Sequence, residues 1–132
     1  MRLPAALYGV VLCVCVAPIL SAQDAVKVDA KHYTVISENA QVRVVKVHYG
    51  PHEKSVMHSH PAGVAVFLTD SKVRFTYPDG KTEEVTTKAG DARYTAALTH
   101  LPENIGDQGM DLVLVELKGK TAHPAKMEMK AK

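Results

Sequence analysis

Between residues 32 and 118 the chain is a succession of short, valine-rich segments separated by turn residues, and this pattern constrains the fold more than any other feature. Apolar and polar residues alternate in most of these segments, as they do in strands with one buried face. No segment has the convincing periodicity of an amphipathic helix. The expected strands cover residues 33–36, 41–49, 54–60, 64–68, 72–77, 83–87, 92–100 and 110–118. Many short strands at this spacing predict an all-β sandwich or barrel.

Two local patterns refine this expectation. The alternation in 41–49 changes phase at Val44-Val45, which predicts a β-bulge there. Residues 78–80 read Pro-Asp-Gly and predict a tight turn, because proline presets the first corner and glycine accepts the strained one. In the 72–77 segment before that turn, the aromatic and valine residues fall on one face.

The first 22 residues predict an export signal. Arg2 supplies a positive charge, residues 3–20 are almost wholly apolar, and Ser21-Ala22 offers small residues for cleavage before Gln23. The alternative is an uncleaved anchor, since an apolar run of this length nearly spans a bilayer. Two prolines in the run favour cleavage. The mature protein is then expected to be secreted or periplasmic, with no attachment to a membrane.

The mature chain is long enough for one domain only, because 132 residues less 22 leave 110. We expect a polar lead-in over 23–31, one barrel over 32–118 and a disordered, lysine-rich tail over 119–132. The two cysteines, Cys13 and Cys15, lie in the signal, which excludes disulfides and thiolate chemistry from the mature chain. With 16 basic and 14 acidic residues, the chain lacks the basic excess of a nucleic-acid-binding protein.

A pair of histidines provides the main candidate for chemistry. His58 and His60 are two residues apart in an extended segment, so their side chains project from the same face. Two such imidazoles can converge on one metal ion, but they need a third ligand from a neighbouring strand. His100, at the end of the 92–100 segment, is the candidate. His52 is either a fourth ligand or a surface loop histidine.

Carboxylates and a tyrosine are the remaining candidates. Glu53 and Glu103 could supply a carboxylate ligand from loops, or could simply be solvated. Tyr94 has the strand parity of His100, so it is either a pocket residue that bonds a substrate or a core tyrosine with its hydroxyl at the rim.

The spacing of these residues resembles the cupin family. Cupins carry a first motif G-x5-H-x-H-x3,4-E-x6-G and a second motif G-x5-P-x-G-x2-H-x3-N. This chain has His58-Ser59-His60-Pro61 and then, after Gly90, the pair His100 and Asn104 at the spacing of the second motif. The resemblance spans most of residues 33–118. The chain departs from the pattern at Ala96, where proline is expected.

The glutamate of the first motif is also missing. It should fall at Val64 or Ala65, and both are apolar. In the family this carboxylate is the fourth metal ligand and often the base that touches substrate. Its absence leaves a three-histidine set, which some metal-binding cupins also have.

The resemblance implies a cupin-type double-stranded β-helix, a jelly-roll barrel, with a divalent transition metal on His58, His60 and His100. Imidazole suits Fe, Mn, Ni, Zn and Cu, so the ligand type does not select the ion. Asn104 and Tyr94 are expected in the pocket or around the ligands. Cupin barrels often pair through a sheet edge, which makes a homodimer the expected assembly.

Three functions remain open on the sequence. The first is a metal-dependent oxygenase or isomerase acting on a small polar substrate. The second is a module that binds metal or a small ligand without turnover, which the missing glutamate favours because no general base is visible. The third is a barrel whose histidines are only polar lining. If metal binds, its affinity should fall as the pH falls through about 6.5, since protonated imidazole cannot coordinate.

Overall fold

The computed structural model describes residues 23–119. The expected signal, 1–22, and all but the first residue of the expected tail lie outside the described residues. The elements in chain order are α1 (Ala25–Val28), β1 (Tyr33–Glu38), β2 (Val42–Tyr49), β3 (His58–His60), β4 (Gly63–Phe67), β5 (Ser71–Thr76), β6 (Thr82–Thr87), β7 (Ala92–Thr95), β8 (Leu98–Asn104) and β9 (Met110–Leu117). Among residues 23–119, no helix is long and apolar enough to cross a membrane.

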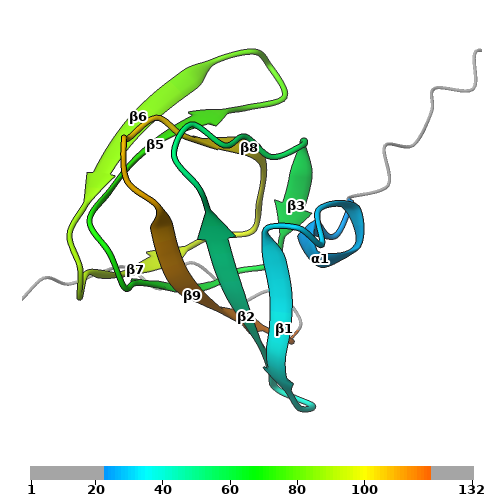
Figure 1. The fold of residues 1–132 in the computed structure, drawn as a ribbon. Coiled ribbons are helices and arrows are strands. Elements are labelled where there is room, and N and C mark those ends of the chain that lie inside the picture. Colours follow the sequence, from blue (N-terminus) through cyan, green and yellow to red (C-terminus); the bar gives the residue numbers. More distant parts are fainter. Residues whose placement is uncertain (1–22, 120–132) are drawn as a thin grey trace, which may run out of the picture.

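The strands form two sheets that face one another across a shared interior (Figure 1). One sheet has the order β1-β2-β9-β4-β7 and the other β3-β8-β5-β6, and all the pairings between these strands are antiparallel. Neighbours in the sheets are often distant in sequence, because β9 lies between β2 and β4, and β8 lies between β3 and β5. The predicted all-β barrel is confirmed.

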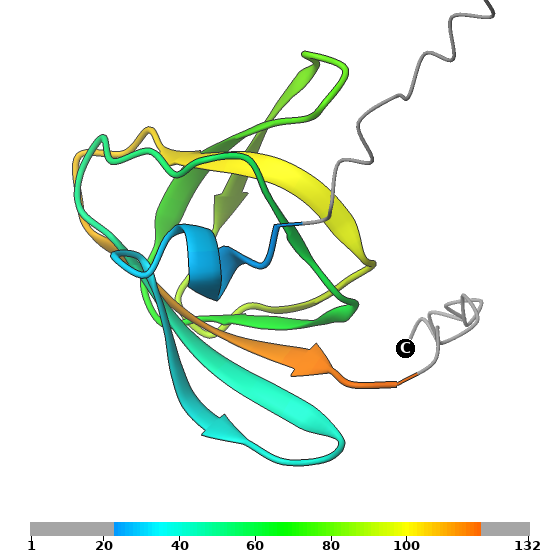
Figure 2. The same cartoon turned by 90° about the vertical axis from the view of Figure 1, so that its right-hand side faces the viewer.

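The core follows the alternation of the long strands. In β2 the side chains of Val45, Val47 and Tyr49 are buried between the sheets, and on β9 Met110 and Leu114 meet them. Valine and tyrosine suit a pleated, half-buried surface, which explains why these segments form strands. The cyan hairpin of β1 and β2 extends beyond the rest of the barrel, with β9 beside it (Figure 2).

The predicted bulge lies on the opposite strand. In β2 the register with β9 is continuous through Val44 and Val45. The shift occurs in β1, where Val35 pairs with Val45 and Ser37 pairs with Val44, so Ile36 is the extra residue. The sequence pattern of β2 therefore located the irregularity in the hairpin, but not the strand that carries it.

The single strand expected over 92–100 is two strands. β7 ends at Thr95 and pairs with β4, whereas β8 begins at Leu98 and pairs with β3 and β5. The chain therefore crosses from one sheet to the other at Ala96-Ala97. The small side chains fit a corner, but alternation alone does not reveal a corner that lacks glycine and proline.

The expected lead-in contains α1, a helix of four residues packed near β1 and β3. Asp24 caps it by accepting a hydrogen bond from the Val26 amide at 3.1 Å, and the same carboxylate bonds Arg43 on β2. Ala25 is fully buried in the core. Contacts with the barrel thus order a stretch whose polar composition predicted a loose one.

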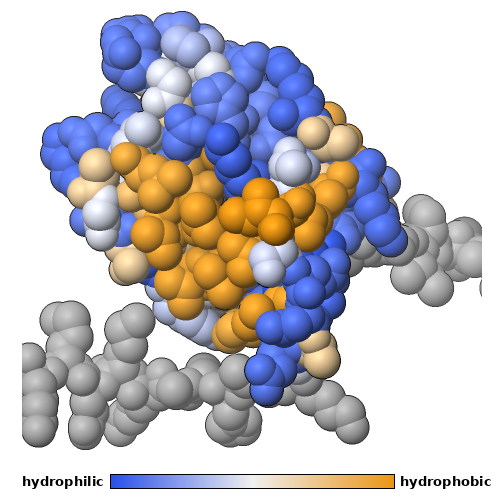
Figure 3. All heavy atoms as spheres, turned by 60° about the horizontal axis from the view of Figure 1, so that its bottom comes forward, coloured by the Kyte–Doolittle hydropathy of each residue, from blue (hydrophilic) through white to orange (hydrophobic). Residues whose placement is uncertain are grey.

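The outer face of the five-stranded sheet is largely apolar. Its side chains alternate with the buried ones, and successive strands place valines and leucines opposite one another in rows. Figure 3 shows a broad apolar area on this side of the molecule. The residues are Val44, Val64, Val66, Leu68, Val113, Val115 and Leu117.

Candidate metal centre

Three histidines from two adjacent strands converge at one end of the barrel interior. In β3, His58 and His60 point inward and are buried, while Ser59 between them bonds Thr99 at 2.7 Å. The pairing of β3 with β8 places His58 opposite His100. One nitrogen from each ring can be chosen so that all three atoms lie within 4.8 Å of one another. The structure therefore brings together the three residues that the sequence selected.

Hydrogen bonds on the far side of two rings fix their tautomers. His58 Nδ1 lies 2.8 Å from the carbonyl oxygen of Val56, and His60 Nδ1 lies 3.0 Å from Glu116 Oε1. Each acceptor requires a proton on Nδ1, so in the neutral form of each ring the lone pair is on Nε2. The two Nε2 atoms lie 3.0 Å apart, within hydrogen-bond distance. At that distance they share one proton or bind one cation together.

The third ring presents a nitrogen with no partner. His100 Nε2 is buried and has no hydrogen bond to any residue of 23–119. The ring is held by stacking on Phe75, with centroids 4.9 Å apart and planes 5° apart. A buried polar atom without a partner costs free energy. Three converging imidazole lone pairs are a donor set that a divalent transition metal fits.

Burial keeps the rings in the form that binds metal. Burial lowers the pKa of His58 to about 4, with a further contribution from His60 nearby. Burial also lowers the pKa of His100 to about 3. Both rings are neutral well below the pH of about 6.5 that the unperturbed imidazole led us to expect. For His58 and His100, protonation therefore competes with metal binding only at a lower pH than the sequence predicted.

A buried carboxylate, which the sequence did not single out, orients one of the ligands. Glu116 on β9 is 1% exposed and accepts hydrogen bonds from His60 Nδ1 and from Arg43 Nε. Arg43 in turn bonds both carboxylate oxygens of Asp24. Burial raises the pKa of Glu116, but the bonds from His60 and Arg43 outweigh it and hold the pKa below its usual value. The carboxylate therefore stays ionised.

Glu116 shares its face of β9 with Leu112 and Leu114, and this alternation is visible in the sequence. A lone carboxylate on an otherwise apolar, inward face is the signal that could have found it. The two positions where the cupin glutamate was expected do not replace it: Ala65 lines the interior and Val64 faces outward. Gly63 pairs with Glu116, and a Cβ there would lie 2.5 Å from the Val115 carbonyl oxygen, so only glycine allows this approach.

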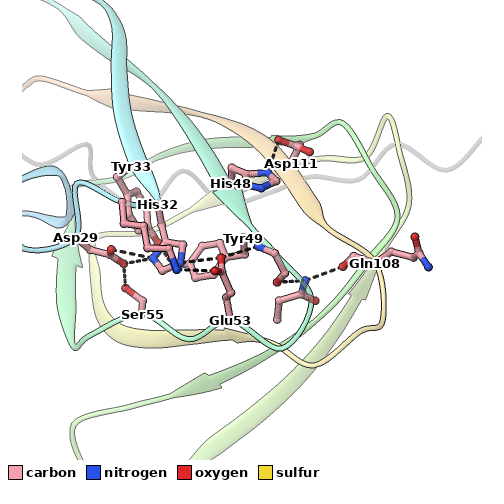
Figure 4. Close-up of polar contacts among 12 residues, drawn as sticks. Asp29, His32, Tyr33, His48, Tyr49, Glu53, Ser55, Gln108 and Asp111 are labelled. Atoms are coloured by element: carbon pink, nitrogen blue, oxygen red, sulfur yellow. Dashed lines mark hydrogen bonds and ion pairs between the residues drawn. The ribbon is translucent and has the colours of Figure 1, made fainter.

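A further buried histidine, His32, lies outside the cluster, and both of its ring nitrogens are hydrogen-bonded (Figure 4). His32 is 5% exposed, and its Nδ1 lies 2.7 Å from Asp29 while its Nε2 lies 3.2 Å from Glu53. The ring stacks on Tyr49 with centroids 4.2 Å apart. Asp29 also accepts a hydrogen bond from Ser55, whose oxygen is 3.2 Å from His58 Nδ1. This network supports the cluster from outside.

The other candidates lie away from the three nitrogens. His52 is 65% exposed and bonds Asp107. Glu53 accepts hydrogen bonds from Lys31, His32 and the Gly50 amide, and Glu103 pairs with Arg74.

The remaining two expected pocket residues have different surroundings. Asn104 is buried, but its amide donates to the carbonyl oxygens of Gly50 and Gln108, so it anchors two loops. Tyr94 is 47% exposed at the edge of the cavity. Its strand parity with His100 is broken by the corner at Ala96-Ala97.

A cavity of about 350 Å³ occupies the interior beside the cluster. His60 and His100 line it, and His58 lies behind them. Most of the wall is apolar and comes from both sheets. Arg93, Tyr77 and Glu83 are polar residues of the same wall. A molecule in this cavity could therefore touch the imidazole end directly.

Comparison with solved structures identifies the fold. A cupin domain from Bordetella pertussis aligns with a TM-score of 0.61 at 22% identity, covering 66% of this chain and 92% of its own. A protein with a double-stranded β-helix domain from Klebsiella pneumoniae aligns with a TM-score of 0.54 at 22% identity, covering 68% and 78%. An RmlC-like cupin from Methanocaldococcus jannaschii aligns with a TM-score of 0.52 at 17% identity, covering 67% and 83%.

A scan against protein-family models gives no match, and a search of curated proteins gives none. The likeness is therefore one of structure, and at these identities it defines the fold. The chain has the RmlC-like cupin fold, a double-stranded β-helix, as its histidine spacing predicted.

Proposed function

We propose that this cupin-fold protein binds one divalent transition metal through His58, His60 and His100 and presents it to a small molecule in the barrel. The observation that carries the proposal is the set of three converging imidazole nitrogens, two fixed as acceptors and the third without a partner. The hydrogen bond that His60 Nδ1 donates to Glu116 is the kind of outer contact that orients a metal-ligating histidine and raises its basicity.

The bound metal would act on a small molecule as a Lewis acid or redox centre, in an oxygenase- or isomerase-type reaction. The residues of the chain contribute three neutral ligands, so the positive charge of the ion is not cancelled by them. Anionic or enolate-type ligands are therefore favoured.

The second candidate is binding without turnover. It is favoured by the position of Glu116, which is in contact with the far side of His60 and paired with Arg43. Among residues 23–119, Glu83 is the carboxylate that lines the cavity, and the hydrogen bond that it accepts from Tyr77 makes it a weaker general base. Reactions that need proton abstraction by the protein are disfavoured for that reason.

Metal analysis of the purified protein tests the site. We expect about one ion per chain in the wild type and nearly none in His58→Ala and His100→Ala. His48→Ala is the matched control, since His48 is 56% exposed and bonds only Asp111. Wild-type metal content in both cluster variants would overturn the proposed site.

Oxygen uptake by the metal-loaded protein separates the two candidates. A panel of enols, thiols and dicarbonyls should contain a compound that is consumed in the presence of the wild type and not of His100→Ala. Ligand binding across the panel with no consumption of any compound would establish the binding module instead.

We propose that the protein is exported and works in the periplasm or outside the cell. The support is the apolar segment before Gln23, with its basic start and small residues at the end. Mass spectrometry of the protein from its native host should give a chain that begins at Gln23. A chain that retains residues 1–22 would contradict this proposal.

We also propose that a second copy covers the apolar outer face of the five-stranded sheet, giving a homodimer. The face carries opposite charges near one end, Lys46 on β2 and Asp111 on β9, so a two-fold axis can place each sign against the other. Leu68→Lys, at a residue that is 53% exposed, should give a monomer by light scattering. Val28→Lys on α1 is the control and should leave the assembly unchanged. A monomeric wild type would overturn the proposal.

A further inference from the structure

The cavity beside the three histidines has an apolar wall along most of its length. Side chains from both sheets contribute to it and alternate with residues on the outer faces. The wall residues that matter here are Val47, Leu112 and Leu114 from one sheet and Val73, Phe75 and Val85 from the other. At about 350 Å³ the cavity is at the small end of the range of about 300–1,000 Å³ for ligand pockets.

The polar groups of the inner wall are engaged with one another. Tyr33 and Tyr49 share a hydrogen bond at 2.9 Å, and burial raises the pKa of Tyr49 to about 12, so its hydroxyl stays protonated. Thr87 bonds Ser71 at 2.6 Å. A ligand that brought hydroxyl or amide groups to this wall would have to break these bonds or leave its own groups unpaired.

Three further polar residues of the wall are also paired. Glu83 accepts a hydrogen bond from Tyr77 at 2.8 Å, and Arg93 donates to Asp91 and to the Thr86 carbonyl oxygen. Within residues 23–119, the buried polar atom of the wall that has no partner is His100 Nε2. The wall therefore offers an unpaired polar partner at His100, and apolar side chains line most of the remainder.

We propose that the ligand is a compact molecule with an apolar body, of the size of a single aromatic ring or short branched chain, and one anionic oxygen donor at its end. The donor, a carboxylate, phenolate or enolate, meets the metal at His60 and His100, and the body packs between the two sheets. This rests on the proposed metal site and narrows its substrate from small polar molecules in general to monoacids with an apolar body.

Three probes test the inference on the zinc-loaded wild type by isothermal titration calorimetry. Benzoate has both the body and the donor, malate has the donor with a polar body, and benzyl alcohol has the body without the anion. We expect benzoate to bind at least about tenfold more tightly than either of the others, because apolar contact in such a pocket contributes on that scale. Equal or tighter binding of malate would overturn the inference.

Two neighbouring residues of β9 provide a matched pair of variants. Leu112 faces the cavity, and Val113 faces the outside of the sheet; both are half-buried. Leu112→Asn should weaken benzoate binding about tenfold or more, and Val113→Asn should not change it. Unchanged affinity in Leu112→Asn would contradict the inference. If Leu112→Asn does not fold, the comparison of the three probes on the wild type decides alone.

Metal content is measured on every sample, so the two proposals fail in different ways. Zinc that does not bind, or binds equally to His100→Ala, removes the metal site itself. Zinc bound at the three histidines with no preference for benzoate removes only the ligand class.

Discussion

His32 and His100 are two imidazoles of one small barrel with opposite surroundings. His32 has a carboxylate on each ring nitrogen and a tyrosine stacked on its face. His100 has a phenylalanine on its face and, within residues 23–119, nothing on Nε2. His32 is buried and His100 is half-buried with a buried Nε2, so burial of a nitrogen does not distinguish a structural histidine from a proposed ligand. The distinction lies in whether the chain itself satisfies the nitrogen.

The largest effect should come from exchanging each ring for phenylalanine in metal-free protein. His32→Phe keeps the stack on Tyr49 but removes the hydrogen bonds of the ring to Asp29 and Glu53, so we expect a loss of about 3 kcal/mol in the free energy of unfolding. His100→Phe removes an unsatisfied atom and should cost little or nothing. Urea unfolding in the presence of chelator measures both.

The two variants should also differ in the amount of metal that they bind. His32→Phe is expected to keep its ion and His100→Phe to lose it. Similar destabilisation by both substitutions, or loss of metal from His32→Phe alone, would break the comparison.

Chelation should produce the next largest effect. An ion present at 100 times its dissociation constant stabilises the folded state by about 2.7 kcal/mol, because it binds only that state. For a domain of this size the melting temperature should fall by about 10 °C or more on adding chelator. The melting temperature of His100→Phe should not respond. An unchanged melting temperature of the wild type on adding chelator would contradict the presence of a bound ion.

Glu116→Gln tests the contact that orients His60 and leaves the three imidazoles themselves unchanged. Glutamine can still accept the bond from His60 but loses the charge that pairs with Arg43. We expect metal affinity to fall about 10- to 100-fold, as it does when outer partners of ligating histidines are changed. Competition with a fluorescent chelator measures the affinity. Glu103→Gln is the matched control, since Glu103 pairs with Arg74 away from the cluster.

The smallest effect is expected at Asp24, the last residue of the chain of hydrogen bonds that runs from His60 through Glu116 and Arg43. The hydrogen bond from Arg43 lowers the pKa of Asp24 below 3.8, so its contribution to stability is present above that pH and is lost as the pH falls through the folded-state value. Asp24→Asn keeps the helix cap and removes the charge. The wild type should be more stable at neutral pH by under about 1 kcal/mol. Urea unfolding should show that the difference shrinks as the pH is lowered from 5 to 3, and a constant difference would exclude the charge as its source.

The sequence predicted the strands and the three histidines for a physical reason. Period-two alternation fixes which residues share a face, so His58 and His60 had to project together. The partnership with His100 depends on a strand pairing between distant segments; its position at the end of an expected strand made it the candidate, and the cupin spacing of His100 and Asn104 supported that choice. Asn104 itself holds loops together.

Other features of the site depend on contacts that alternation does not encode. Glu116 touches His60 only because β9 lies between β2 and β4 in the opposite sheet, and the corner at Ala96-Ala97 changes which residues share a sheet with His100. The role of His32 likewise depends on Asp29 and Glu53, which approach it from both sides. The alternation of residues along a strand therefore predicts the histidine cluster better than it predicts the residues that orient those histidines.

The order of the strands has a consequence for how the histidine cluster forms. The carboxylate that fixes His60 is 56 residues further along the chain, on the last strand. Closing so long a loop costs chain entropy before the contact can form, which places this hydrogen bond late in folding. The orientation of His60 is therefore completed only when the last strand joins its sheet.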